Sequence, residues 1–180
     1  MSISLGDGVP EFNLLNANKS LGGEYVNSSD YFGENGLIVV FECNHCPYVI
    51  ASIERINQIS QYANSNSIGF VGINSNDASV YASDSYENMV KRAEKGMPYP
   101  YLFDETQEIA HRFGAKRTPE FFLFNSNRKL IYSGRMDDSP KDPNKVSTNE
   151  LRDAIDSLLN GDKPEIGFTE SIGCSVKWKV

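Results

Sequence analysis

The chain lacks the features that stabilise small extracellular proteins or anchor proteins in membranes. Its 180 residues include three cysteines, too few for a disulfide framework, which a chain of this length does not need. The longest unbroken apolar run, residues 37–41, is far shorter than the roughly 20 residues that span a bilayer. The first residues have neither the basic nor the apolar segment of a secretory signal. We therefore expect a soluble, cytoplasmic protein.

The chain also lacks an excess of positive charge. It has 17 Lys and Arg against 24 Asp and Glu, a formal net charge of −7, whereas nucleic-acid-binding proteins usually carry a basic surface. We expect neither nucleic acid nor membrane among its partners. Hydrophobic residues make up 39% of the chain, enough to build a core, and the length fits a single domain over 1–180.

Hydrophobic patterns predict alternating strands and helices. The run 37–41 is rich in β-branched residues, as is typical of a strand buried on both faces, and 68–73 repeats this pattern. Apolar residues at three- and four-residue spacing predict a helix over 47–62. Further elements are expected as follows: helices at 84–95, 105–113 and 149–160, and strands at 99–103, 120–125 and 129–132.

The two ends of the chain differ from this central part. Residues 1–36 hold many turn formers and predict an N-terminal extension with short strands, while 162–180 form a C-terminal tail. Ser147 and Glu150 have the spacing of a capping box for the last helix. The alternation of strands and helices predicts an α/β fold, with parallel crossovers and helices on both faces of a central sheet.

Two cysteines stand in a C-x-x-C segment, Cys43-Asn44-His45-Cys46, between the first buried strand and the first long helix. Free N–H groups and the positive dipole end of a helix N-terminus stabilise a thiolate, and an imidazolium at His45 does the same. The thiolate is the nucleophile of thiol–disulfide exchange. The segment therefore indicates a redox site with Cys43, Cys46 and His45 as catalytic residues and no cofactor.

A zinc site is the main alternative use of such a pair. A structural zinc ion needs four ligands, and only Cys174, His45 and His111 remain to complete the set. None of them forms a second closely spaced pair. We therefore expect no metal.

A second marker, Thr118-Pro119, lies directly before the strand expected at 120–125. A proline at the start of an edge strand explains it without any function. A cis bond that holds the loop against the cysteines is the functional alternative, and the C-x-x-C segment upstream favours it. Pro119 is then a catalytic candidate that shapes the substrate-binding loop, and Thr118 contacts the substrate.

Together, the segment 41–48, Thr118-Pro119-Glu120 and the hairpin and helix that follow resemble the thioredoxin superfamily. They resemble most closely its peroxiredoxin-like branch of alkyl hydroperoxide reductase/thiol-specific antioxidant-like proteins, or redoxins. Residues 134–138 and 173–179 are also similar to that branch. The resemblance implies a thioredoxin-like fold, with a central mixed β-sheet flanked by helices, an N-terminal β extension and a C-terminal tail. It also implies a redox role.

The sequence departs from a peroxiredoxin around Cys46, the equivalent of the peroxidatic cysteine. Cys43 stands where that family has Thr or Ser, Val39 stands where it has Pro, and Pro119 falls at or near the position of its Arg. The hydroxyl and guanidinium groups of that family polarise the peroxide O–O bond. Without them, the site resembles a thioredoxin dithiol on a peroxiredoxin-shaped body.

We therefore predict a thiol–disulfide oxidoreductase. Cys43, expected at the exposed edge of the helix, attacks a substrate disulfide, and Cys46 then resolves the mixed disulfide. The partners are a disulfide-containing protein or small-thiol substrate and an unidentified thiol reductant. One alternative is a thiol-dependent peroxidase, an antioxidant protein in which Cys46 reacts with a hydroperoxide. A second is a non-enzymatic module that binds a metal or a partner.

Two further residues have alternative roles. Cys174 either resolves an intermediate at Cys46 or is a small buried hydrophobe beside Trp178, and we favour the latter because nothing in the sequence brings the tail to the cysteines. Glu42 either accepts a proton during the reaction or is a plain strand-end carboxylate, which is the favoured interpretation.

Overall fold

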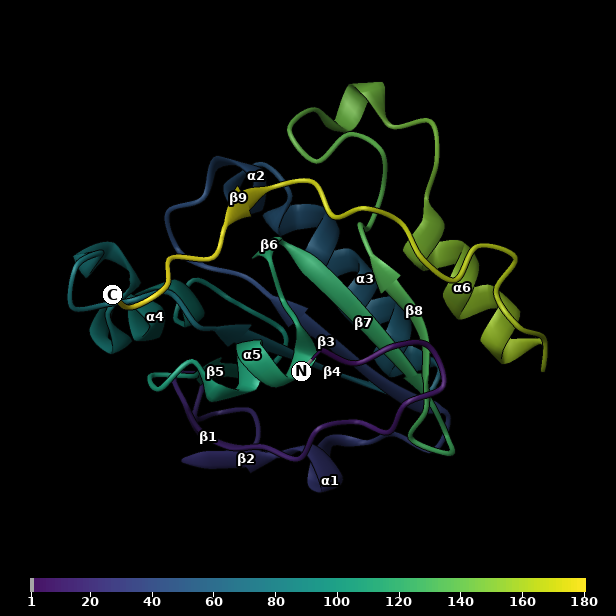
Figure 1. The fold of residues 1–180 in the computed structure, drawn as a ribbon, viewed down its shortest axis with the longest axis horizontal. Helices are drawn as coiled ribbons and strands as arrows, with labels where there is room; N and C mark the ends of the chain where they lie inside the picture. The colour runs from purple at the N-terminus through teal and green to yellow at the C-terminus, as the bar shows by residue number, and fades with distance from the viewer. Residues whose placement is uncertain (1) are drawn as a thin grey trace.

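A seven-stranded sheet forms the centre of the computed structural model, which describes residues 2–180 (Figure 1). Met1, part of the expected N-terminal extension, lies outside the described residues. The strands are β1 (Asn13–Asn16), β2 (Tyr25–Asn27), β3 (Gly36–Phe41), β4 (Ile68–Asn74), β5 (Tyr101–Phe103), β7 (Glu120–Asn125) and β8 (Leu130–Gly134). Their order across the sheet is β2-β1-β5-β4-β3-β7-β8.

Parallel and antiparallel pairs both occur in this sheet. β3 pairs parallel with β4 and antiparallel with β7, β4 pairs parallel with β5, and the remaining pairs are antiparallel. The expected central mixed β-sheet is therefore confirmed. A separate two-stranded sheet joins β6 (Arg117–Thr118) to β9 (Cys174–Ser175).

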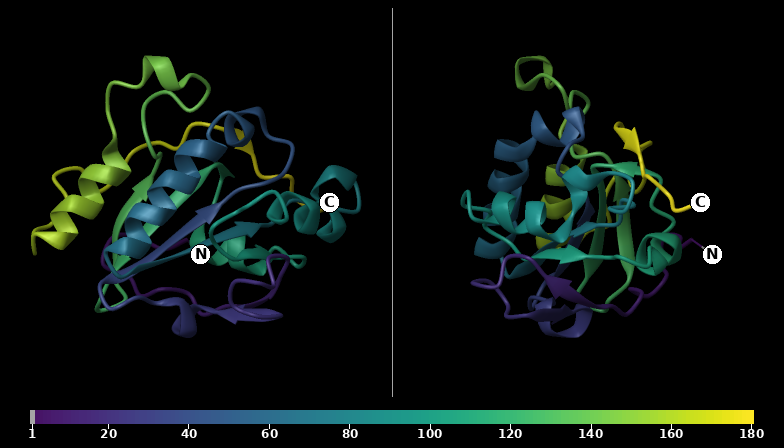
Figure 2. Two further views of the ribbon diagram at one scale, coloured as in Figure 1. Left: turned by 180° about the vertical axis from the view of Figure 1, so that it is seen from behind. Right: turned by 90° about the vertical axis from the view of Figure 1, so that its left-hand side faces the viewer.

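Helices cover both faces of the sheet, as predicted (Figure 2). The helices are α1 (Ser28–Tyr31), α2 (Pro47–Ile50), α3 (Ile53–Ser65), α4 (Tyr86–Ala93), α5 (Glu108–Phe113) and α6 (Glu150–Leu159), with short 3₁₀ turns at Ala82–Asp84 and Pro143–Lys145. One buried cluster joins Ile56 of α3, Met89 of α4 and Leu151 of α6 to β3 residues such as Ile38. The opposite face packs Ile109 and its neighbours in α5 against the alternate β3 residues. Because successive strand residues point to opposite faces, β3 is buried along its whole length.

The helix expected over 47–62 is two helices, α2 and α3. The break falls at Ala51 and Ser52. Ser52 is buried, and its hydroxyl donates to the carbonyl oxygen of Pro140 at 2.8 Å, in the loop before α6. This bond joins segments far apart in the sequence, so the periodicity of the helix gave no indication of it.

The predicted capping box of the last helix is wrong. The N-cap of α6 is Asn149, which makes no side-chain capping bond. The Ser147 hydroxyl donates to Asp138 instead, and the Glu150 carboxylate binds Arg135 Nε at 2.9 Å. Partners from β8 and the following loop thus replace the local capping pattern.

Both ends of the chain pack onto the sheet. β1 and β2 are the short strands expected in the N-terminal extension, and they pair antiparallel with each other. β1 also joins the sheet by pairing Leu15 with Phe103 of β5. The tail expected at 162–180 runs from α6 across the carboxyl end of the sheet to the loop before α4 (yellow in Figure 1). On the way, β9 meets β6.

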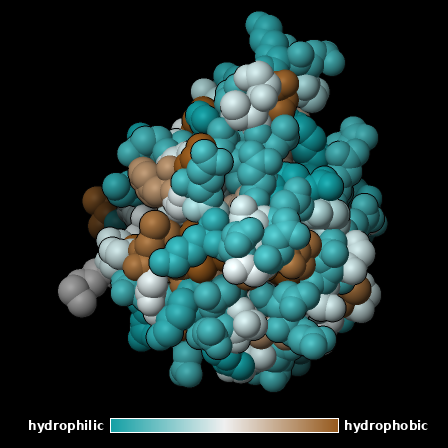
Figure 3. All heavy atoms as spheres, turned by 90° about the vertical axis from the view of Figure 1, so that its right-hand side faces the viewer, coloured by the Kyte–Doolittle hydropathy of each residue, from teal (hydrophilic) through white to brown (hydrophobic). Residues whose placement is uncertain are grey.

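The surface on the α6 side of the molecule is mixed in character. Figure 3 shows hydrophobic side chains there as separate patches among hydrophilic ones. Among the described residues, no helix is both long and apolar enough to cross a membrane.

Candidate active site

The segment 43–46 lies where β3 ends and α2 begins. Cys46 is the N-cap residue of α2, and Pro47 occupies the first helical position, where the missing N–H of proline has no cost. The side chains of Cys43 and Cys46 form a buried cluster with Val49, and the two cysteines are only 1% and 0% exposed. The strand–helix junction therefore places both thiols at a helix N-terminus, inside the protein.

The Thr118-Pro119 loop meets the two cysteines. The peptide bond between Thr118 and Pro119 is cis, and Thr118 is buried. The Thr118 hydroxyl lies 3.5 Å from Cys43 Sγ, and the Thr118 carbonyl oxygen lies 3.4 Å from Cys46 Sγ. The structure thus brings together residues that are 72 to 75 positions apart in the chain.

Cys46, not Cys43, is the thiol that the site stabilises as a thiolate. A hydrogen bond from the Cys43 thiol lowers the pKa of Cys46 to about 4, and the Cys174 thiol and the backbone N–H of Val49 contribute to this shift. The pKa of Cys43 is raised by the same hydrogen bond, by burial and by the charge of Asp84. The expectation that Cys43 lies at the exposed edge of the helix is wrong, because Cys43 is buried and packs against Thr118.

His45 is held by a carboxylate that the sequence analysis missed. Its Nδ1 lies 2.5 Å from Asp84 Oδ2, and its ring stacks on Tyr81 at 5.8 Å between centroids. Asp84 is fully buried and also accepts the backbone N–H of Asn44 at 2.6 Å. Asp84 belongs to no motif and follows a loop after β4, so no local signal pointed to it.

Cys43, His45 and Asp84 form a group of potential metal ligands. One ligand atom from each lies within 4.8 Å of the others. His111 is not in this group, and its ring stacks on Trp178 instead. Three ligands are one fewer than a structural zinc ion needs.

Glu42 is not the plain strand-end carboxylate that was expected. It is fully buried, with Tyr99 donating to Oε2 at 2.6 Å and Arg92 Nη2 lying 2.5 Å from Oε1. Arg92 also donates to the carbonyl oxygen of Cys43 at 3.2 Å. Tyr99 and Arg92 therefore bind both carboxylate oxygens of Glu42. Through Arg92, this buried ionic network also contacts the backbone of the segment 43–46.

Cys174 lies at the site, which corrects the expectation that the tail stays away from it. In the pairing of β9 with β6, Cys174 is opposite Thr118, and its side chain packs against the cluster of Cys43, Cys46 and Val49. Burial raises the pKa of Cys174 to about 11. The pairing of two-residue strands was not detectable from the sequence.

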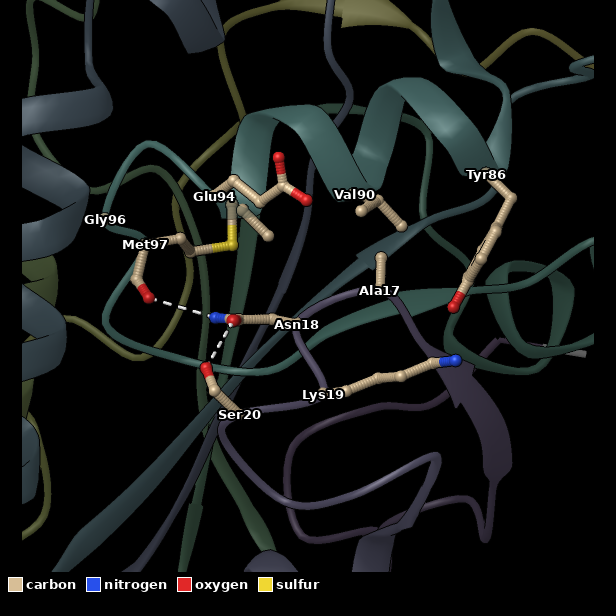
Figure 4. Close-up of a pocket in the computed structure, with 10 residues that line it drawn as sticks. Ala17, Asn18, Lys19, Ser20, Tyr86, Val90, Glu94, Gly96 and Met97 are labelled. Atoms are coloured by element: carbon tan, nitrogen blue, oxygen red, sulfur yellow. Dashed lines mark hydrogen bonds between the residues drawn. The ribbon is translucent and has the colours of Figure 1, made fainter.

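A cavity of about 510 Å³ lies elsewhere, between the loop after β1 and α4 (Figure 4). Its lining includes Asn18, Lys19, Tyr86 and Glu94 but none of the cysteines. Asn18 spans the space, donating to the carbonyl oxygen of Met97 at 3.0 Å.

Comparison with known proteins places the chain among known families and folds. The Redoxin family model matches residues 4–151. An uncharacterized conserved protein from Geobacillus kaustophilus is 39% identical, with a TM-score of 0.89 over 98% of this chain and 93% of its own. A hypothetical protein from Sinorhizobium meliloti 1021 is 32% identical, with a TM-score of 0.90 over 100% of this chain and 97% of its own. Peroxidoxin BcpB from Mycobacterium tuberculosis is 19% identical, with a TM-score of 0.59 over 88% of this chain and 95% of its own.

No curated protein matches the chain. The fold is thioredoxin-like, as expected from the sequence. The matches indicate a protein of thiol–disulfide oxidoreductase or peroxidase type, whose partners in general are thiols and disulfides.

Proposed function

Since the chain belongs to the Redoxin family, we propose that it is a thiol–disulfide oxidoreductase whose redox-active pair is Cys43 and Cys46. One observation carries the proposal: Cys46 is the N-cap of α2, and the neighbouring Cys43 thiol lowers its pKa to about 4. At neutral pH such a thiol is largely ionised, and the thiolate is the form that attacks a disulfide.

The reaction proceeds in two exchanges. The Cys46 thiolate attacks one sulfur of a substrate disulfide, which forms a mixed disulfide and releases the first substrate thiolate. The Cys43 thiol then attacks Cys46 Sγ, so that the Cys43–Cys46 bond forms as the mixed disulfide breaks. The proton of Cys43 passes to the leaving thiolate. A thiol reductant restores the dithiol by the reverse steps, and the substrate is a disulfide-containing protein or small disulfide.

Three neighbouring residues assist these exchanges. Thr118, whose hydroxyl and carbonyl face the two sulfurs, contacts the incoming disulfide, and Pro119 fixes the shape of that loop. His45 lies beside Cys43 and is oriented by Asp84. The imidazole of His45 is thereby held next to the Cys43 sulfur, which becomes the leaving group when the reductant opens the disulfide.

Peptide mapping after oxidation tests the proposal. The reduced protein is treated with a small disulfide, its remaining thiols are alkylated, and its digest is analysed by mass spectrometry. We expect a Cys43–Cys46 disulfide that dithiothreitol reverses, and no reaction at this site in Cys46→Ser. Stoichiometric zinc together with no reversible disulfide in the protein would instead favour the metal-binding alternative.

A thiol-dependent peroxidase is the second candidate, because the Cys46 thiolate is also the species that attacks a hydroperoxide. That reaction leaves a sulfenic acid on Cys46 and releases an alcohol or water. The nearby Arg92 is engaged by Glu42 and by the backbone of Cys43, which leaves it poorly placed to polarise an O–O bond. Rapid hydroperoxide consumption by Cys43→Ser, lost in Cys46→Ser, would favour the peroxidase.

A further inference from the structure

The C-terminal strand β9 brings a third sulfur to the proposed redox pair. β9 runs antiparallel to β6, with Thr118 opposite Cys174 and Arg117 opposite Ser175. Thr118 also contacts Cys43 and Cys46, so one residue of β6 joins all three cysteines. The Cys174 side chain packs directly on the cluster that contains the other two.

The chain is adapted to this close approach. A Cβ atom at Gly173 would lie 1.9 Å from the carbonyl oxygen of Thr118, a distance that no side chain tolerates. Glycine immediately before Cys174 therefore allows the backbone of the tail to lie against the loop that contains Pro119. Any larger residue at this position would move Cys174 away from Cys46.

The tail is fixed again just beyond β9. Lys177 donates its N–H to Asn76 Oδ1 at 2.8 Å and accepts the N–H of Asp77 at 2.8 Å. Trp178 stacks on His111 with 4.2 Å between the ring centroids. Backbone bonds and ring stacking thus hold the chain just after Cys174, on the C-terminal side of its contact with the cysteine cluster.

The three thiols differ in their exposure to solvent. Cys43 and Cys46 are essentially buried, whereas Cys174 is partly exposed. Cys174 is therefore the most exposed of the three thiols, in contact with the cluster that contains Cys46.

We propose that Cys174 is a second resolving thiol, which competes with Cys43 for the mixed disulfide on Cys46. Cys174 Sγ attacks Cys46 Sγ, the bond between Cys46 and the substrate breaks, and the Cys174 proton passes to the leaving substrate thiolate. The product is a Cys46–Cys174 disulfide, with no oxidant beyond the substrate itself. This inference rests on the proposed reaction of Cys46 with disulfides.

The Cys43→Ser variant tests the proposal with glutathione disulfide, because Cys174 is then the one thiol left to resolve Cys46. We expect non-reducing peptide mapping to find a Cys46–Cys174 disulfide. The matched control is Cys43→Ser/Cys174→Ser/Ser175→Cys, which moves the thiol to the neighbouring exposed position of the strand. The control should retain roughly ten-fold more glutathione on Cys46, because a tethered and aligned thiol acts at an effective concentration in the millimolar range.

The outcomes separate the two proposals. Equal amounts of glutathione on Cys46 in Cys43→Ser and in the control would overturn the role of Cys174. In that case, a Cys43–Cys46 disulfide in the unaltered protein would leave the proposed function standing. A Cys46 that reacts with glutathione disulfide in none of the proteins would overturn both. Cys43→Ala, with the same expected Cys46–Cys174 disulfide, repeats the test should Cys43→Ser fold poorly.

Discussion

Two regions of the molecule contrast in their space and their chemistry: the thiol centre, formed by Cys43, Cys46 and Cys174, and the cavity beside α4. At the thiol centre, two cysteines with strongly shifted pKa values have almost no contact with solvent. The cavity has about 510 Å³ of space but no cysteine in its lining. The difference teaches that open space and cysteine chemistry lie in different parts of this molecule. The site proposed above is the closed one, and its use requires that a substrate gain access to Cys46.

Among the variants that test this contrast, the one that removes the proposed nucleophile should have the largest effect on disulfide turnover. Cys46→Ser should reduce disulfide turnover to background, because no other thiol in the centre has a lowered pKa. Ser20→Ala, which alters the cavity lining, should leave turnover unchanged. Turnover of a small disulfide, measured with dithiothreitol as reductant, checks both variants. An equal loss in Ser20→Ala would place the active site in the cavity.

The buried ionic network of Glu42, Tyr99 and Arg92 should raise the free energy of unfolding. Arg92→Ala leaves the buried Glu42 carboxylate with Tyr99 but no cation, and breaking a buried pair in this way costs about 3–5 kcal/mol. Arg112→Ala is the control, because Arg112 pairs with Glu108 on the surface and such pairs contribute about 0–1 kcal/mol. Urea unfolding measures the free energy of unfolding of both variants. Similar losses would show that the network does not support the centre.

Weakening the contact of β9 with β6 should make Cys46 more accessible to reagents. Gly173→Ala places a Cβ against the carbonyl of Thr118 and should weaken closure by β9. A loss of about 1.4 kcal/mol in closure would raise the alkylation rate of Cys46 about ten-fold. Gly8→Ala, where a Cβ meets no atom within 4 Å, is the control. Equal rates in the two variants would contradict the covering role of β9.

A further expected effect is a pH dependence of stability. The pKa of Cys46, lowered to about 4, lies below the usual thiol value near 8.5. A lowered pKa stabilises the folded protein fully above the unfolded pKa, and this contribution is lost as the pH falls toward the folded pKa. The stability of the reduced protein relative to Cys46→Ser should therefore rise between about pH 5 and 8. A constant difference would show that Cys46 is not ionised in the fold.

The local part of the site could be predicted from the sequence. A strand, a C-x-x-C segment and a helix follow one another directly, and Thr118-Pro119 precedes a strand, so their placement depends on short-range patterns. The start of the helix at residue 47 was predicted correctly. The burial of Cys43 was not, because it depends on the Thr118 loop, which comes from a distant part of the chain.

The remaining part of the site depends on long-range contacts. Asp84 reaches His45 from the 3₁₀ turn before α4, and Arg92 reaches Glu42 from α4 itself. Cys174 arrives through a pair of two-residue strands. None of these contacts has a periodicity or spacing, because each is set by how separate segments pack in three dimensions.

The pairing of β9 with β6 also has a consequence for biosynthesis. A ribosome releases Cys43, Cys46 and the sheet strands well before Cys174 emerges, and domains begin to fold while they are being synthesised. During this interval, the thiol pair of the nascent protein lacks its contact with Cys174. That contact forms only after β9 has emerged from the ribosome and paired with β6.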